Sequence, residues 1–203
     1  MATFNSTGSG NANADATWTE SGQPAAGDHC IIASGHTVTL TAAEAWGSVD
    51  ILGELAGGGY TLTLNDGGNS YIINHDGEIS GTLNVLITGT TSRNIDTGAA
   101  TGNVNNLTIT PASGTPTFTS IADTTIAGNL TINSGATYDT DSGNNRQLTV
   151  TGDVTNAGTL TYNASAVSSR KLISTGTLTG ANGGVYTVTG AGLGDTVRTI
   201  DLG

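Results

Sequence analysis

This sequence has few of the residues that stabilise small secreted domains or build a thick globular core. Its 203 residues include one cysteine and three prolines, and aromatic residues make up only 4% of the chain. One cysteine cannot form an internal disulfide, so stability must come from the backbone and from packing. The apolar content of 35% is low for a globular enzyme of this length, so we expect a thin core.

Charged residues are also scarce, and basic residues are the scarcest. The chain has 16 acidic and 5 basic residues, which gives a formal net charge of −11. This charge repels phosphate groups, so nucleic acids and anionic membrane surfaces are disfavoured as partners. The N-terminus has no basic segment followed by an apolar one, and no run of about 18 apolar residues occurs later. We therefore expect neither a secretory signal nor a membrane span.

Glycine, threonine and asparagine are abundant instead. The chain contains 31 glycines, and no segment has the apolar spacing of a long amphipathic helix. Threonine suits a pleated strand, while glycine and asparagine tolerate the positive φ angles of tight turns. The composition thus predicts many short strands joined by turns.

The most informative feature is an internal repeat of about 24 residues, a period that is typical of solenoid folds. Residues 146–162, RQLTVTGDVTNAGTLTY, share their landmarks with residues 170–186, RKLISTGTLTGANGGVY, 24 positions later. We interpret each repeat as one coil of a solenoid with three short strands. Three series of residues mark these strands: Leu83, Leu107, Leu130, Val154 and Leu178; Tyr138, Tyr162 and Tyr186; and Ile126, Val150 and Ser174.

Apolar and polar residues alternate within each predicted strand. Leu148 and Val150 fall on one face, and Thr149 and Thr151 fall on the other. Because successive coils stack at about 4.8 Å, like residues should lie above one another. We therefore expect the leucine series and the tyrosine series to form two columns inside the solenoid. The sequence predicts a single-domain, all-β parallel β-helix, with the right-handed coil that parallel crossovers prefer.

The chain divides into three segments by pattern. Residues 1–45 do not echo the repeat, and we expect them to form an N-terminal cap and entry strands. Residues 46–190 are the coils. Residues 191–203 are expected to dock against another subunit or to fold back as a lid, with Val197, Ile200 and Leu202 as the candidate docking residues.

The N-terminal segment also resembles a known type of module. Residues 17–64 contain, in order, Trp18, Pro24, Ala26, Gly27, Asp28, Ile31, Ile32, Gly35, the strand 37–40, Gly47 and Gly53. This order resembles the glycine-rich entry module of β-helices in extracellular carbohydrate-associated proteins, phage virion proteins and bacterial surface proteins. The later coils resemble filamentous-haemagglutinin-type and tailspike-type β-helices in pattern. The resemblance implies a right-handed parallel β-helix and carries over no active site.

Two groups of residues near the middle and start of the chain are candidates for chemistry. His29, Cys30 and His36 are metal-ligand types, but adjacent residues of a strand point to opposite faces. We therefore expect Cys30 to be a buried structural residue. His75 and Asp76 precede a glycine, and we interpret them as solvated loop groups rather than as an acid–base pair.

Polar residues at predicted turns complete the candidates. Asp139 and Asp141 could hold Ca²⁺ together with Asn144 or Asn145, but Ca²⁺ needs six or more oxygen ligands, so we expect a polar turn there. Asn129 should lie over Asp153 in a ladder of amides. We predict no catalytic residue, no metal and no cofactor.

The functional expectation follows from an architecture without visible chemistry. We expect a non-enzymatic structural protein of a virus particle, such as a phage decoration, spike or fibre component that is made in the host cytoplasm. Its partners would be other virion proteins or copies of itself, with a trimer favoured, and a host glycan or receptor. Two alternatives remain open: a bacterial cell-surface adhesin or a fragment of one, and a carbohydrate-active β-helix enzyme.

Overall fold

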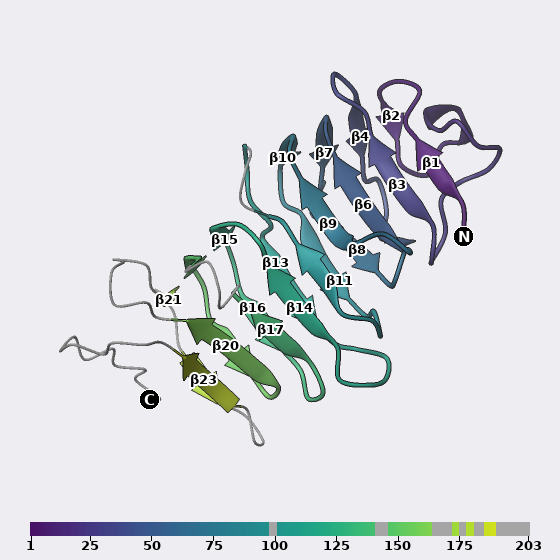
Figure 1. Cartoon of the computed structure of the whole chain (residues 1–203). Helices are drawn as coiled ribbons and strands as arrows, with labels where there is room; N and C mark the ends of the chain where they lie inside the picture. Colours follow the sequence, from purple (N-terminus) through teal and green to yellow (C-terminus); the bar gives the residue numbers. More distant parts are fainter. Residues whose placement is uncertain (98–100, 141–145, 164–171, 175–177, 181–184, 190–203) are drawn as a thin grey trace.

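The computed structural model describes residues 1–97, 101–140, 146–163, 172–174, 178–180 and 185–189, and its coils form a parallel β-solenoid (Figure 1). About seven coils of about 23 residues each are stacked along one axis, with β1 at one end and β23 at the other. All paired strands are parallel, and the described residues contain no α-helix. The predicted all-β parallel β-helix with three strands per coil is confirmed.

The first side of the solenoid is one sheet that runs along all the coils. In spatial order its strands are β1 (Thr3–Asn5), β3 (His29–Ile32), β6 (Ser48–Ile51), β9 (Tyr71–His75), β12 (Arg93–Ile95), β14 (Thr117–Ser120), β17 (Thr137–Asp139), β20 (Thr159–Asn163) and β23 (Val185–Thr189).

The second side is also one sheet. Its strands are β5 (Glu44–Trp46), β8 (Thr61–Leu64), β11 (Asn84–Ile87), β13 (Asn106–Ile109), β16 (Leu130–Ile132), β19 (Val154–Asn156) and β22 (Leu178–Gly180).

The third side is divided into two sheets. The first sheet contains β2 (Gly10–Asn11), β4 (Thr37–Thr39), β7 (Glu54–Ala56) and β10 (Glu78–Ser80), and the second contains β15 (Thr124–Ile126), β18 (Leu148–Val150) and β21 (Leu172–Ser174). Only two isolated bridges, Glu78 with Thr101 and Val104 with Ile126, connect these sheets within the described residues.

The core is the narrow space that the three sides enclose. In β8, Leu62 and Leu64 are buried while Thr61 and Thr63 are partly exposed, and the same alternation recurs along the stack. Each coil therefore contributes only a few apolar side chains. Their burial is shared between neighbouring coils, so no coil has a complete core by itself.

The predicted leucine column is correct for four of its five members. Leu107 pairs with Leu130, Leu130 with Val154, and Val154 with Leu178. The partner of Leu107 on the preceding coil is Val85, whereas Leu83 is buried just before β11 begins. Leu83 and Leu107 are therefore one sequence repeat apart but do not pair. The coil that ends at Leu107 is shorter than the repeat, so Leu107 pairs with Val85 instead.

The predicted tyrosine column is wrong. Tyr138 pairs with Leu160, Leu160 pairs with Tyr186, and Tyr162 pairs with Val188. The corner between the second and first sides is two residues shorter after β19 than after β16, and β20 is two residues longer than β17. The coil length of the repeat is kept on the second and third sides, while β17 and β20 on the first side pair at a shorter spacing.

The segment expected to form the N-terminal cap contains strands and an aromatic cluster. Strands β1 to β4 join the first and third sides, and the 3₁₀-helix η1 (Asp15–Thr17) lies in the connection between β2 and β3. Trp18 packs edge-on against Phe4 and Trp46, with ring centroids 6.3 and 5.7 Å away, and its Nε1 donates to the Ala12 carbonyl. The other terminal segment, 191–203 with Val197, Ile200 and Leu202, lies outside the described residues.

Candidate functional site

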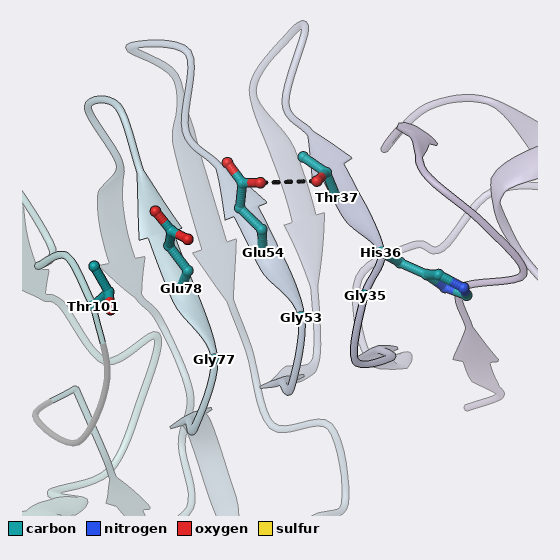
Figure 2. Close-up of a pocket in the computed structure, with 8 residues that line it drawn as sticks. All are labelled: Gly35, His36, Thr37, Gly53, Glu54, Gly77, Glu78 and Thr101. Carbon is teal, nitrogen blue, oxygen red and sulfur yellow. Dashed lines mark hydrogen bonds between the residues drawn. The ribbon is translucent and has the colours of Figure 1, made fainter.

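A groove of about 450 Å³ crosses four successive coils at the start of the third side. Its lining consists of residues 35–37, 53–54, 77–78 and Thr101 (Figure 2). These short segments lie where the chain turns into β4, β7 and β10 and at the bridge that follows β10. The groove therefore runs along the solenoid axis, across the strands rather than parallel to them.

Glycine at the corners allows the coils to approach closely along this groove. A Cβ at Gly77 would collide with the carbonyl oxygen of Gly53 and with the backbone of Leu52, and one at Gly53 would collide with the carbonyls of Ala33 and His36. Backbone thus packs directly against backbone at these positions. Because no side chain projects from them, the space between the flanking side chains stays open.

Two glutamates stand side by side in the groove. Glu54 and Glu78 begin β7 and β10 and pair in register, so they are separated by about one strand spacing of 4.8 Å along the axis. Leu55 and Ile79 point into the core, which places both glutamates on the outer face. Figure 2 shows the two carboxylates extending from adjacent strands while His36 points away from them.

The two carboxylates have different surroundings. Thr37 Oγ1 donates to Glu54 Oε2 over 2.8 Å, and Ser80 Oγ donates to Glu54 Oε1. The hydrogen bonds from Ser80 and Thr37 lower the pKa of Glu54, because they favour its charged form. The carboxylate of Glu78 makes no hydrogen bond to a described residue and is exposed. Glu54 is thus held ionised and fixed, whereas Glu78 is available to a ligand.

The charge around the groove limits what it can bind. Before Arg93 the chain contains five aspartates and four glutamates but no lysine or arginine. An anionic ligand would be repelled there, whereas a ligand with hydroxyl or cationic donors could hydrogen-bond to the carboxylates and threonines. No aromatic side chain is among the groove-lining residues that the structure describes, so the groove lacks the stacking platform that many sugar-binding sites contain.

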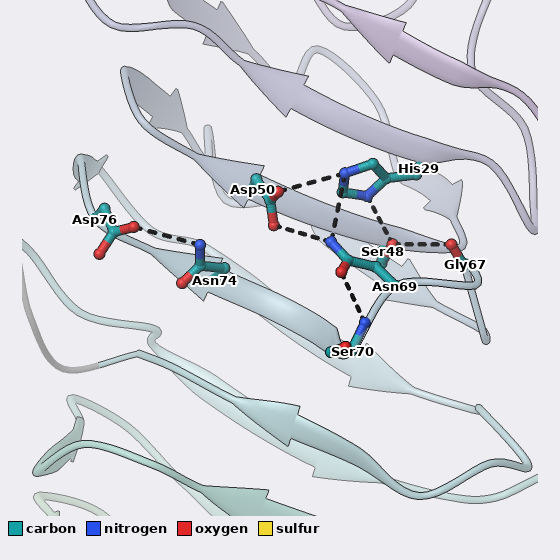
Figure 3. A network of polar contacts seen from close by, with 8 residues as sticks. All are labelled: His29, Ser48, Asp50, Gly67, Asn69, Ser70, Asn74 and Asp76. Carbon is teal, nitrogen blue, oxygen red and sulfur yellow. Dashed lines mark hydrogen bonds and ion pairs between the residues drawn. The ribbon is translucent and has the colours of Figure 1, made fainter.

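A second polar cluster lies on the first side and connects three coils (Figure 3). The imidazole of His29, on β3, lies between two residues of β6: its Nδ1 is 2.8 Å from Ser48 Oγ, and its Nε2 is 3.4 Å from Asp50 Oδ2. Asn69, on the following coil, donates from Nδ2 to Asp50 Oδ1 over 3.3 Å. The order serine, histidine, aspartate matches that of a hydrolytic triad.

The surroundings of Ser48 exclude a catalytic role for this cluster. Ser48 is only 1% exposed, and its hydroxyl also lies 3.4 Å from the carbonyl oxygen of Gly67. A single Cβ added at Gly67 would collide with Ser48 Oγ, so no acyl group could reach the hydroxyl. The cluster therefore fastens neighbouring coils to one another.

The predicted role of Cys30 is confirmed. Cys30 is fully buried between Phe4 and Val49, with which it pairs, and burial raises the pKa of its thiol. His29 points to the opposite face of β3, and His36 Nδ1 lies 2.8 Å from Ser6 Oγ. These three residues do not converge, and no cluster of three potential metal ligands occurs in the part of the chain that the structure describes.

The expectation for His75 is wrong. His75 is fully buried at the end of β9, in register with Ile51, and only Asp76 is exposed in the turn. The alternation of Ile73, Asn74 and His75 contained the signal, because it continues the inward face of β9 by one more residue. The Asp-Gly turn begins one position later than we assumed.

An asparagine ladder runs along the corner before the second side. Asn105 and Asn106 donate from Nδ2 to Asn84 Oδ1, and Asn106 Oδ1 accepts from the backbone N–H of Asn129. Asn129 Oδ1 accepts from the backbone N–H of Asp153 over 2.8 Å, which confirms the predicted contact. Asp139 pairs with Thr119 and Thr161, but Asp141, Asn144 and Asn145 lie outside the described residues.

Comparison with known proteins gives no match: no family model, curated protein or solved structure is similar to this chain. No helix among the described residues is long and apolar enough to cross a membrane.

Proposed function

We propose that this chain is a non-enzymatic structural protein of a virus particle, a phage decoration, spike or fibre component exposed on the particle surface. The observation that carries the proposal is the first side, a parallel sheet of nine strands that extends along the whole described stack. Backbone hydrogen bonds connect every coil to the next, and the sole cysteine is buried and unpaired. Such a ladder resists proteases and shear without disulfides, as an exposed particle component must.

The proposed partners are other virion proteins or further copies of the chain, with a trimer favoured for a spike. Open ends of a solenoid present unpaired N–H and C=O groups, which a neighbouring subunit can cover. At the N-terminal end the side chains of Phe4, Trp18 and Trp46 pack together and are buried. The proposed docking segment is residues 191–203, which lie outside the described residues.

The deciding experiment is quantitative mass spectrometry of particles purified from the source of the sequence. We expect the chain at a fixed stoichiometry relative to the major capsid protein, and its retention after mild protease treatment of intact particles. Recovery of the chain on bacterial cell surfaces, with none in particles, would contradict this proposal and favour an adhesin.

A carbohydrate-active solenoid is the second candidate, and the pair Glu54 and Glu78 favours it. Retaining glycosidases hold two carboxyl groups about 5–5.5 Å apart, which is close to the strand spacing of about 4.8 Å that separates the paired residues Glu54 and Glu78. Release of reducing sugar from neutral polysaccharides, abolished by Glu78→Gln and by Glu54→Gln but not by Glu44→Gln, would support it. Absence of any release from a broad polysaccharide panel would contradict it.

A further inference from the structure

His75 is a titratable group that neither the groove nor the polar cluster on the first side uses. Its side chain is fully buried, and neither ring nitrogen has a hydrogen-bond partner of good geometry. Ile51 lies above it in register on β6. On the following coil Ile95 pairs with Ile73, so Thr97 falls level with His75, and its buried Oγ1 also has no partner. The imidazole thus lies in a column that offers no well-aligned acceptor for a second proton.

The stack is irregular at the level of His75. The pairing of β9 with β12 shifts register between Asn94 and Ile95, and Ile72 is left unpaired as a bulge. On the third side the first sheet ends at β10, and only isolated bridges continue toward β15. The second side stays regular, because β11 and β13 pair over four residues. Fewer paired residues nevertheless join the coils of β9 and β12 than join the coils of β6 and β9.

The geometry points to an acid-sensitive joint: protonation of His75 opens the solenoid locally between the coil of β9 and the coil of β12. A charged imidazole at this position must either leave the core or draw water into it. The shift of register makes this level easier to open than the regular level between the coils of β6 and β9. The coils on either side keep their regular ladders and stay folded.

The charged groups around His75 do not compensate for the cost of burying a charged imidazole. Those on the elements packed around His75 are Asp50 on β6, Asp76 after β9, Glu78 on β10, and Arg93 and Asp96 at β12. Asp96 and Asp76, together with the backbone at Thr97 and Thr101, favour the charged ring. Burial outweighs them, so the pKa of His75 lies below the ordinary value.

The direction of the pH effect follows from the lowered pKa. Below about pH 6.5, the ordinary pKa of histidine, the unfolded chain binds a proton at His75 that the folded chain does not. The unfolding constant should therefore rise as the pH falls, by up to about tenfold per pH unit, until the pKa of the folded state is reached. Above about pH 6.5 this group should have no effect on stability.

The test is denaturant unfolding of the full chain between about pH 7.5 and about pH 5, a range above the titration of ordinary carboxylates. The chain has only three histidines. We expect His75→Leu to abolish the rise in the unfolding constant, whereas the matched variants His29→Gln and His36→Gln should keep it. A wild-type rise that persists unchanged in His75→Leu would overturn the inference.

Two measurements on the wild-type protein keep the inference testable if His75→Leu does not fold. In an NMR titration the His75 ring should stay neutral in the native state at pH values where free histidine is protonated. Amide exchange at about pH 5 should accelerate in β9 and β12 relative to β16 and β19. Native-state titration of His75 at about pH 6.5, or uniform exchange along the stack, would each refute the acid-sensitive joint.

Discussion

The coils before and after residue 97 stack in the same way, but they differ in coil length and in amino-acid composition. On the second side, Glu44 pairs with Leu62, whereas Leu107 pairs with Leu130 and Leu130 with Val154, so the early coil is several residues shorter than the later ones. Both regions nevertheless have parallel strands, in register except at the bulge between β9 and β12, and an alternating inward face. Coil stacking thus requires inward alternation and small corner residues, and it tolerates differences in coil length that the corners absorb.

The two regions also differ in how their coils are fastened. All histidines, the cysteine, both tryptophans and all glutamates lie at or before Glu78. There, coils are joined by individual clusters such as that of His29. In the later coils one contact is repeated, in the asparagine ladder that runs from Asn84 to Asp153. The early region therefore has the greater variety of side chains, and the later region has the more repetitive contacts.

A charge placed in the core should produce the largest effect, and it tests whether both regions depend equally on the inward face. Leu62 and Leu130 are fully buried on the second side. We expect Leu62→Asp and Leu130→Asp each to destabilise the fold by about 4 kcal/mol or more, because an unpaired carboxylate is buried among apolar side chains. Thermal unfolding measures this effect. Thr63→Asp and Thr131→Asp are the matched outward controls, and equal losses in controls and core variants would show that the inward register is wrong.

Corner glycines should give the next largest effect. A Cβ at Gly77 in the early region, or at Gly158 in the later one, would collide with backbone carbonyls of the neighbouring coil. We expect Gly77→Ala and Gly158→Ala each to cost about 3 kcal/mol, since the coils must move apart. Gly59 has open space, so Gly59→Ala should cost only about 1 kcal/mol for its positive φ. If all three variants unfolded at one denaturant concentration, close stacking at the corners would not be the constraint.

The fold could be predicted from the later coils because their length is nearly constant. On the second and third sides, residues that are one repeat apart in the sequence occupy the same position in their strands. The repeat spacing therefore predicted the column from Leu107 to Leu178 and the contact of Asn129 with Asp153. The prediction of the tyrosine column was wrong because the corner before β20 is two residues shorter than the corner before β17, while β20 is two residues longer than β17. The coil length is thereby preserved, which hides the change of register.

The groove could not be predicted, because its residues come from coils of unequal length. Thr37 pairs with Glu54, and Glu54 pairs with Glu78, but the second step along the sequence is clearly longer than the first. No single period brings these residues together, so the glutamate pair is visible only once the strands are placed. The burial of His75 depended on one residue at a strand end, where sequence patterns are least informative.

Amide contacts between coils should have a smaller and comparable effect in the two regions. Asn65 Oδ1 accepts from the backbone N–H of Gly27, and Asn129 Oδ1 accepts from that of Asp153, both over 2.8 Å. We expect Asn65→Ala and Asn129→Ala each to lower the free energy of unfolding by about 1 kcal/mol, the usual value of one hydrogen bond. Denaturant titration would measure both. A clearly larger loss for Asn129→Ala would mean that the ladder is cooperative and that the repetitive region is more than a sum of single contacts.

The smallest effect should come from the carboxylate that the early region holds in its groove. Because hydrogen bonds from Ser80 and Thr37 lower the pKa of Glu54, its ionised form contributes stability above the ordinary pKa of about 4.3. This contribution should be lost as the pH falls through the lowered pKa. Glu54→Gln should change stability at about pH 7 by no more than about 0.5 kcal/mol, as for other surface positions, and should make the acid limb of the stability curve shallower. The double variant Thr37→Val with Ser80→Ala tests the cause, because it removes both hydroxyl donors and should make the acid limb as shallow as Glu54→Gln does. An acid limb as steep as that of the wild type in this double variant would show that the hydroxyls of Ser80 and Thr37 do not govern the titration of Glu54.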